Sequence, residues 1–161
     1  MAFLKIRKEE DPMLYRKCRE VTKYDAKLGQ LMDDMFDTME DADGVGLAGP
    51  QVGVLRRVIV MCVDGKTKLD LVNPIIVEQS GLQRGYEGCL SFPGQHGYVE
   101  RPNHVIVRGF NRSGEPIEYE GTGLLARCIC HEMDHLDGHV FLERVTEAPK
   151  DFEEEQWEDE D

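Results

Sequence analysis

The chain has 161 residues and a formal net charge of −13 at pH 7, and this length fits one domain around a single hydrophobic core. It contains no run of 18 apolar residues, and its first ten residues lack the apolar segment of a signal peptide, so we expect no membrane attachment. Its five cysteines follow no regular pattern, which favours a reducing compartment and free thiols.

Most of the negative charge lies at the C-terminus. Residues 147–161 contain nine acidic residues and one lysine, a net charge of −8, which leaves −5 for the rest of the chain. A folded domain that is mildly acidic lacks the basic surface that binds nucleic acid, so we expect no direct DNA binding. The composition predicts one folded domain over residues 1–146 and an acidic, disordered tail over residues 147–161.

The first half of the chain predicts two helices and a glycine-rich segment. Asp11 and Pro12 are typical of a helix start, and we expect that helix to run through about residue 19. Apolar residues three and four apart predict an amphipathic helix over residues 25–42. Residues 44–53 hold four glycines and a proline, which exclude a regular helix or a central strand and let a ligand approach the backbone.

The second half predicts short strands and one further long helix. Strands are expected over residues 57–63, 69–72, 75–78, 98–101, 104–110 and 116–120, with a last extended piece over 140–145. A helix should begin at about Thr122 and end before Gly138. Short strands and two long helices without regular alternation indicate an α+β fold with largely antiparallel sheets.

This last helix contains the clearest chemical motif, a His-Glu-x-x-His sequence. His131 and His135 lie one turn apart on the same helix face, so both imidazoles can bind one metal ion. Glu132 can then take a proton from a metal-bound water without binding the ion itself. The alternative is a surface helix that carries two histidines by chance, but the motif needs three residue types in fixed register.

The apolar pattern around the motif favours a buried site. Leu124, Cys128 and the two histidines form one stripe, and a second stripe beside it is entirely apolar. A helix that is apolar on two faces is a core element rather than a surface one. The metal site is therefore expected inside the protein.

The residues alone do not decide which side chain is the third metal ligand. Cys89 lies in a glycine-flanked loop, where a thiolate could approach an ion, although a cysteine there could equally be an inert buried residue. Glu143, Glu147 and the glutamates of residues 153–155 are the alternatives, as in a zincin peptidase. Gln51 is the one long polar side chain of the glycine-rich segment and a candidate donor to an oxyanion.

Three segments together resemble one known family. Residues 44–51, 87–91 and 131–135 are similar, in order and separation, to the three motifs of peptide deformylase, and the resemblance spans residues 11–144. It implies an α+β fold with antiparallel sheets around a central His-Glu-x-x-His helix. It also implies a hydrolase that removes the formyl group from the N-terminal methionine of new polypeptides and releases formate.

The resemblance also implies roles for individual residues. Cys89, His131 and His135 would bind the metal, Glu132 would act as general acid and base, and Gln51 with the backbone N–H of Leu90 would hold the oxyanion. Substrate contacts are expected from Val45, Gly46, Gly88, Leu124 and Cys128, with Tyr86 and Phe92 as further pocket residues and Arg101 fixing the loops. The family usually uses Fe²⁺ and also accepts Zn²⁺, Ni²⁺ or Co²⁺, and the sequence does not choose among these ions.

The resemblance sets expectations for partners and location too. N-formyl-methionyl peptides are the expected substrates, in a bacterial cytoplasm or as a phage-encoded form, and an organelle form is less favoured without a transit peptide. Many bacterial members dock on the ribosome through a basic C-terminal helix, whereas this acidic tail would repel RNA phosphates. A different metal hydrolase with a glutamate ligand and a non-catalytic metal-binding module are the alternative functions.

Overall fold

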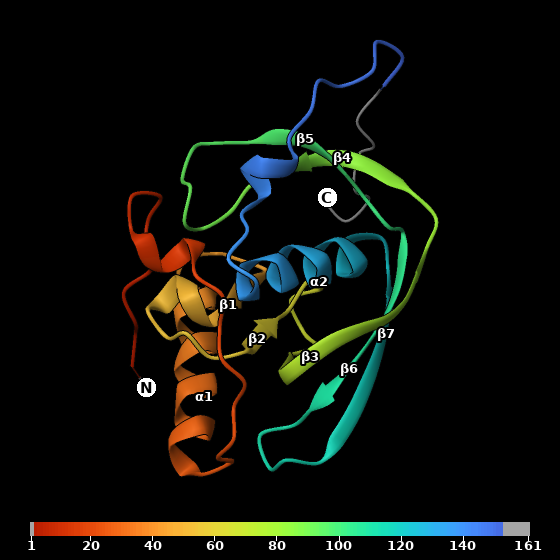
Figure 1. Cartoon of the computed structure of the whole chain (residues 1–161). Helices are drawn as coiled ribbons and strands as arrows, with labels where there is room; N and C mark the ends of the chain where they lie inside the picture. The colour runs from red at the N-terminus through yellow and green to blue at the C-terminus, as the bar shows by residue number, and fades with distance from the viewer. Residues whose placement is uncertain (1, 153–161) are drawn as a thin grey trace.

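The computed structural model describes residues 2–152 and contains two α-helices and seven β-strands (Figure 1). The elements in chain order are the 3₁₀ turn η1 (Pro12–Tyr15), α1 (Ala26–Asp41), β1 (Gly46–Ala48), the 3₁₀ turn η2 (Gly49–Val52), β2 (Val58–Met61), β3 (Leu69–Ser80), β4 (Gln83–Glu87), β5 (Gly97–Arg101), β6 (His104–Phe110), β7 (Pro116–Thr122), α2 (Gly123–Leu136) and the 3₁₀ turn η3 (Phe141–Arg144). Residues 153–161 of the predicted disordered tail lie outside the described residues.

The strands form two antiparallel sheets, which confirms the predicted α+β class. Five strands pair in the order β1-β2-β3-β6-β7, and β4 pairs with β5 in a separate hairpin. Helix α2 lies between the larger sheet and the β4–β5 hairpin in Figure 1. Strands β1 and β4 each have one edge without a neighbouring strand among residues 2–152, so backbone groups are available on both sides of the space beside α2.

Strand β2 is buried on both faces because a helix packs on each side of it. All four of its residues are buried, and Ile59 and Met61 share one core with α2, while Val58 and Val60 share another with α1. Successive side chains of a strand point to opposite faces, so an uninterrupted apolar run is what such a sandwiched strand needs. This double burial fixes α2 against the sheet.

The predicted helices are confirmed where the periodicity was strong. The helix expected over residues 25–42 is α1, capped by the Asp25 side chain at 3.1 Å from the Leu28 nitrogen. Helix α2 begins after Thr122, and Gly138 follows its end with φ of 83°, a conformation that favours glycine.

Other expected boundaries were wrong. The helix expected through residue 19 is only the single turn η1, capped by Asp11, and the last extended piece is the turn η3. The glycine-rich segment contains the edge strand β1 and the turn η2, so its glycines permit a short edge strand while excluding a central one.

The two strands expected around Asn73 are one strand, β3, interrupted by a bulge. The register with β6 shifts between Val72 and Ile75, and Asn73 adopts φ of 51°. Its side chain compensates for that unusual backbone, because Oδ1 accepts from the Val21 nitrogen at 2.8 Å and Nδ2 donates to the Val21 oxygen at 2.9 Å and the Tyr24 hydroxyl at 3.1 Å. Asn73 thereby ties the segment before α1 to the sheet.

Within residues 2–152 no helix combines the length and apolarity that crossing a bilayer requires.

We predict that Asn73→Ala lowers the free energy of unfolding by about 2–4 kcal/mol, because three partly buried hydrogen bonds are lost at roughly 1 kcal/mol each and alanine disfavours a positive φ. Urea denaturation measures the change. Asn103→Ala, at an exposed position, is the control and should stay within about 0.5 kcal/mol of the parent. Equal stability of the two variants would contradict this role for Asn73.

Candidate functional site

Helix α2 carries both histidines of the motif on its buried face. His131 is 8% exposed and His135 is fully buried, and their ring centroids lie 5.1 Å apart. His131 also stacks on Phe141 of η3 with a centroid distance of 5.9 Å. The helix and the packing behind it therefore fix both rings, as the spacing of four residues predicts.

Cys89 reaches the histidines from the loop that follows β4. Its Sγ lies 3.4 Å from Nε2 of His135, and one ligand atom each from Cys89, His131 and His135 all lie within 4.8 Å of one another. No other group of three potential metal ligands is found among residues 2–152. The structure thus brings together the thiol and the two imidazoles.

The glutamates considered as alternative ligands lie elsewhere. Glu143 pairs with His139 at 3.0 Å and accepts a hydrogen bond from the Val140 nitrogen, and Glu147 is exposed. Residues 153–155 lie outside the described part of the chain. Among the residues described, Cys89 is accordingly the third donor of the cluster.

A buried carboxylate, Glu87, holds the cluster together. Arg101 donates two hydrogen bonds to it at 2.8 and 2.9 Å, Arg127 donates one at 2.7 Å, and Nδ1 of His131 lies 3.0 Å from its Oε1. Burial alone would raise the pKa of Glu87, but the hydrogen bonds from Arg101 and His131 hold that pKa well below its usual range. Because a carboxylate only accepts, Nδ1 of His131 donates, which leaves Nε2 free for the ion.

Arg101 extends this network to the outer side of α2. Its guanidinium also donates to Asp134 at 2.9 Å, and Arg144 donates to the same carboxylate at 2.6 and 2.9 Å. These contacts agree with the expectation that Arg101 fixes the loops around the site. They join β4, β5, α2 and η3 into one charged unit.

Glu132 lies beside β1 and is 3% exposed. Its Oε1 has no hydrogen-bond partner within residues 2–152, and burial raises its pKa to about 7. A Cβ atom at Gly46 would lie 2.5 Å from Oε2 of Glu132 and 2.7 Å from Sγ of Cys128. Only a glycine therefore lets β1 pass this close to the acid.

Gln51 approaches the cluster from the opposite side. Its Nε2 lies 3.4 Å from Sγ of Cys89 and donates to Oγ of Ser91 at 3.2 Å, while its Oε1 accepts from the Ala48 nitrogen at 3.0 Å. Because the side-chain oxygen of Gln51 accepts this hydrogen bond, the nitrogen end of the amide faces the thiol. The glycine-rich segment thus delivers a fixed N–H donor beside the candidate metal ligands.

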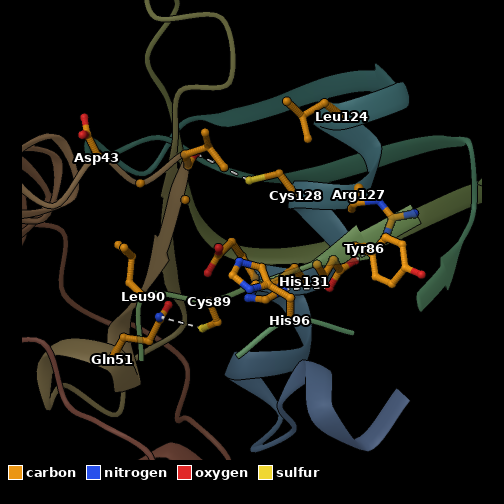
Figure 2. Close-up of a pocket in the computed structure, with 16 residues that line it drawn as sticks. Asp43, Gln51, Tyr86, Cys89, Leu90, His96, Leu124, Arg127, Cys128 and His131 are labelled. Atoms are coloured by element: carbon orange, nitrogen blue, oxygen red, sulfur yellow. Dashed lines mark hydrogen bonds and ion pairs between the residues drawn. The ribbon is translucent and has the colours of Figure 1, made fainter. Parts of the chain in front are cut away.

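A pocket of about 350 Å³ opens beside this cluster. Figure 2 shows Gln51, Cys89 and Leu90 on one side of it and Leu124 and Cys128 on the other. The residues that line it include every substrate-contact candidate from the sequence, namely Val45, Gly46, Gly88, Leu124 and Cys128. Tyr86 also lines it, whereas Phe92 does not, because its ring is buried against Phe141 with a centroid distance of 6.0 Å.

The donor set fits a divalent metal ion. A thiolate and imidazoles bind Fe²⁺, Zn²⁺, Ni²⁺ and Co²⁺ more readily than ions that prefer oxygen ligands. Burial lowers the pKa of His135 to about 3, which favours the neutral ring that binds a metal. Burial also acts to lower the pKa of His131, but its hydrogen bonds to Cys89 and Glu87 raise that pKa, so an ion bound there would displace a proton. The unpartnered Oε1 of Glu132 lies in the same enclosed region and is available to a bound water molecule.

Some contributing residues were not recognised from the sequence. Glu87 was noted only as part of a motif, and Arg127 was not singled out, although it lines the pocket and contacts Glu87 and Gln83. His96 also lines the pocket, and its ring occupies the space where Gly88 would carry a Cβ. For Arg127 there was a signal, because a charged residue within the apolar stretch of a core helix needs a buried partner.

A partly buried thiol and two buried imidazoles beside a carboxyl group and an amide suit a metal-dependent hydrolase. The chain matches the family model for polypeptide deformylase over residues 3–151. It is 52% identical over 151 residues to a peptide deformylase of Agathobacter rectalis, covering 94% of this chain and 95% of that protein. It is 49% identical over 147 residues to peptide deformylase 1 of Bacillus subtilis, with 91% and 92% covered. The chain therefore belongs to the polypeptide deformylase family of enzymes.

Solved structures give the same result. The crystal structure of peptide deformylase from Thermotoga maritima superimposes with a TM-score of 0.88 at 38% identity, covering 91% of this chain and 100% of that one. A peptide deformylase from Synechococcus elongatus in complex with actinonin gives a TM-score of 0.86 at 41% identity, with 89% and 80% covered. The fold expected from the sequence resemblance is therefore confirmed.

We predict that the purified chain binds one divalent ion and that Cys89→Ala, His131→Ala and His135→Ala each lose it, because two remaining ligands do not hold the ion in a closed site. Metal content per chain, measured by mass spectrometry after dialysis, tests this. Cys62→Ala is the matched cysteine control, since Cys62 is only partly buried and packs on the α1 side of the sheet. Retention of the ion by Cys89→Ala would contradict the assignment.

Proposed function

We propose that this enzyme hydrolyses the formamide bond of N-formyl-methionyl peptides, using Cys89, His131 and His135 to hold a divalent metal. The observation that carries the proposal is the meeting of these three donor atoms within 4.8 Å beside an open pocket. The family membership supports the same reaction class. Fe²⁺ is the ion we propose in the cell, with Zn²⁺, Ni²⁺ and Co²⁺ as substitutes.

The bound ion would supply Lewis acidity, which lowers the pKa of water and polarises a carbonyl group. The protein residues around it must then move one proton and stabilise one negative charge. Glu132 takes the proton from the attacking water and returns it to the amine as the C–N bond breaks, so that formate and a free amino terminus are released. Its enclosed carboxyl group, adjacent to a ligand on α2, is placed for that transfer.

Gln51 and Leu90 stabilise the charge that develops on the formyl oxygen. Nε2 of Gln51 points at the thiol of Cys89, so its N–H lies next to the reacting group. The backbone N–H of Leu90, the residue after that cysteine, is the second donor. Donors fixed before the reaction begins cost no reorganisation in the transition state, which is why an oxyanion site of this kind accelerates hydrolysis.

The peptide runs beside β1 and places its first side chain in the pocket. The edge of β1 at Gly46 offers backbone hydrogen bonds to an extended substrate, and Val45 and Gly88 flank the entry. Leu124 and Cys128 give the pocket an apolar wall for methionine. New polypeptides carry this formyl group, so we place the enzyme in the bacterial cytoplasm, with its catalytic domain in residues 1–146. A transient contact with the ribosome would have to form away from the acidic tail, which repels RNA phosphates.

We predict that the metal-loaded chain removes formate from formyl-Met-Ala-Ser and that Glu132→Gln lowers kcat by about 10²–10⁴-fold while the metal content stays unchanged, because the proton carrier is lost and the ligands are not. Formate release, measured with Fe²⁺ under anaerobic conditions or with Ni²⁺, gives kcat for the parent and for Glu132→Gln. Mass spectrometry gives their metal content. Cleavage of internal peptide bonds instead would favour a zincin-type peptidase. Bound metal without any turnover would favour a non-catalytic module.

A second prediction concerns the close approach of β1 to the acid. Gly46→Ala places a methyl group 2.5 Å from Oε2 of Glu132 and must displace it, and a shift of about 1 Å in a catalytic group costs roughly a hundredfold in rate. Gly29→Ala in α1 is the matched control, because a Cβ there makes only ordinary contacts, at 3.7 Å, with the side chain of Arg112. An unchanged kcat in both variants would contradict this role of Gly46.

A further inference from the structure

Ser91 contacts one of the two proposed oxyanion donors and has no role in the chemistry described above. Its side chain is fully buried, and its Oγ accepts a hydrogen bond from Nε2 of Gln51 at 3.2 Å. This is the one side-chain hydrogen bond that Ser91 makes within residues 2–152. A buried hydroxyl group needs such a partner, so the two residues are held together in the interior of the protein.

The side-chain amide of Gln51 has an anchor at each end. Its Oε1 accepts from the Ala48 nitrogen at 3.0 Å, and its Nε2 donates to Ser91. The bond to Ala48 alone leaves the amide plane free to rotate about that contact, and the second bond removes this rotation. Because the amide nitrogen carries two hydrogens, the one that Ser91 does not bind is available toward Sγ of Cys89, a contact of 3.4 Å that Figure 2 marks.

Ser91 is itself held in place by the turn to which it belongs. The Phe92 nitrogen donates to the Cys89 oxygen at 2.9 Å, so Leu90 and Ser91 occupy the two central positions of a tight turn. The ring of Phe92 is buried and fixes the end of this turn in the core. Three successive residues thus carry the thiol, the backbone N–H of Leu90 and the hydroxyl that binds Gln51.

Gln51 comes from a separate segment, the turn η2, 40 residues before Ser91 in the chain. The Arg7 nitrogen donates to the Gln51 oxygen at 2.7 Å and holds the backbone of this turn from its other side. The two proposed oxyanion donors therefore lie on different segments, and the bond between Gln51 and Ser91 joins those segments beside the cluster. Such a site accelerates a reaction only when both donors already point at the atom where charge develops.

We propose that Ser91 is a positioning residue, which orients Nε2 of Gln51 so that this donor and the backbone N–H of Leu90 converge on one oxygen atom. This inference rests on the proposed function and gives Ser91 a part in stabilising the transition state. Ser91 contacts neither the metal ligands' donor atoms nor the substrate in this proposal, and it acts through Gln51 alone. Its loss should therefore lower kcat and leave KM unchanged.

The kinetic test is a double-mutant cycle with formyl-Met-Ala-Ser on the metal-loaded full chain. We expect Ser91→Ala to lower kcat by about 5- to 50-fold, a part of the roughly 10²–10³-fold that an entire oxyanion donor contributes. In the Gln51→Ala background the same change should cost less than about twofold, because the residue through which Ser91 acts is already absent. Ser91→Thr keeps the hydroxyl and should restore most of the loss, and Ser80→Ala, at an exposed serine of β3, should leave kcat unchanged.

The second test needs no turnover. Nuclear magnetic resonance of the zinc-loaded chain, labelled with ¹⁵N in its glutamine side chains, reports the mobility of the Gln51 amide, whose signal is the one missing from Gln51→Ala. We expect an order parameter of about 0.85 in the parent and below about 0.6 in Ser91→Ala. The metal content of these two chains, measured by mass spectrometry, should be equal.

Three results would overturn the inference. They are an unchanged kcat in Ser91→Ala, losses that multiply independently in the cycle, and a loss of activity that a lower metal content explains. If Ser91→Ala does not fold, the parent spectrum decides, because a mobile Gln51 amide there refutes the positioning role, whereas a rigid amide together with an active Ser91→Thr supports it. Failure of the parent to release formate refutes the proposed function instead, and the spectra still test the anchor.

Discussion

The buried carboxylate of Glu87 is the interaction on which the site depends. It accepts hydrogen bonds from Arg101 on β5 and from Arg127 and His131 on α2, and it lies two residues before Cys89. One anion therefore sets the distance between the loop that brings the thiol and the helix that brings the imidazoles. Removing one partner from such a network would leave an uncompensated buried charge, so the three cationic or N–H donors and the carboxylate depend on one another.

The remaining architecture brings the other reacting groups to the same point. Strand β2 is sandwiched between two helices and holds β1 at the edge of the sheet, so Gly46 can pass within contact distance of Glu132. The turn after β1 then places Gln51 opposite the helix. The five-stranded sheet and the separate hairpin lie on either side of α2, so the edges of β1 and β4, which no other strand of residues 2–152 covers, flank the pocket.

Helices α1 and α2 could be predicted because their apolar spacing persists over several turns, and the pairing of His131 with His135 follows from that helix alone. Strand β3 was split in the prediction, since Asn73 and Pro74 are typical of a turn and only the tertiary bonds to Val21 and Tyr24 keep the strand continuous. Cys89 could not be chosen over downstream glutamates by spacing, because its approach is set by long-range packing. The role of Arg127 depends on the same packing. The sequence shows only a charged residue in an apolar helix, which indicates a buried partner without identifying it.

The proposed site requires that one sulfur atom and two ring nitrogens bind the same ion, with the carboxyl group of Glu132 beside it. X-ray absorption spectroscopy of the zinc-loaded chain tests this most directly, because sulfur and nitrogen ligands scatter at different distances. We predict one sulfur at about 2.3 Å and two imidazole nitrogens at about 2.0–2.1 Å in the first coordination shell. A first shell of nitrogen and oxygen only, with no sulfur, would contradict the central claim.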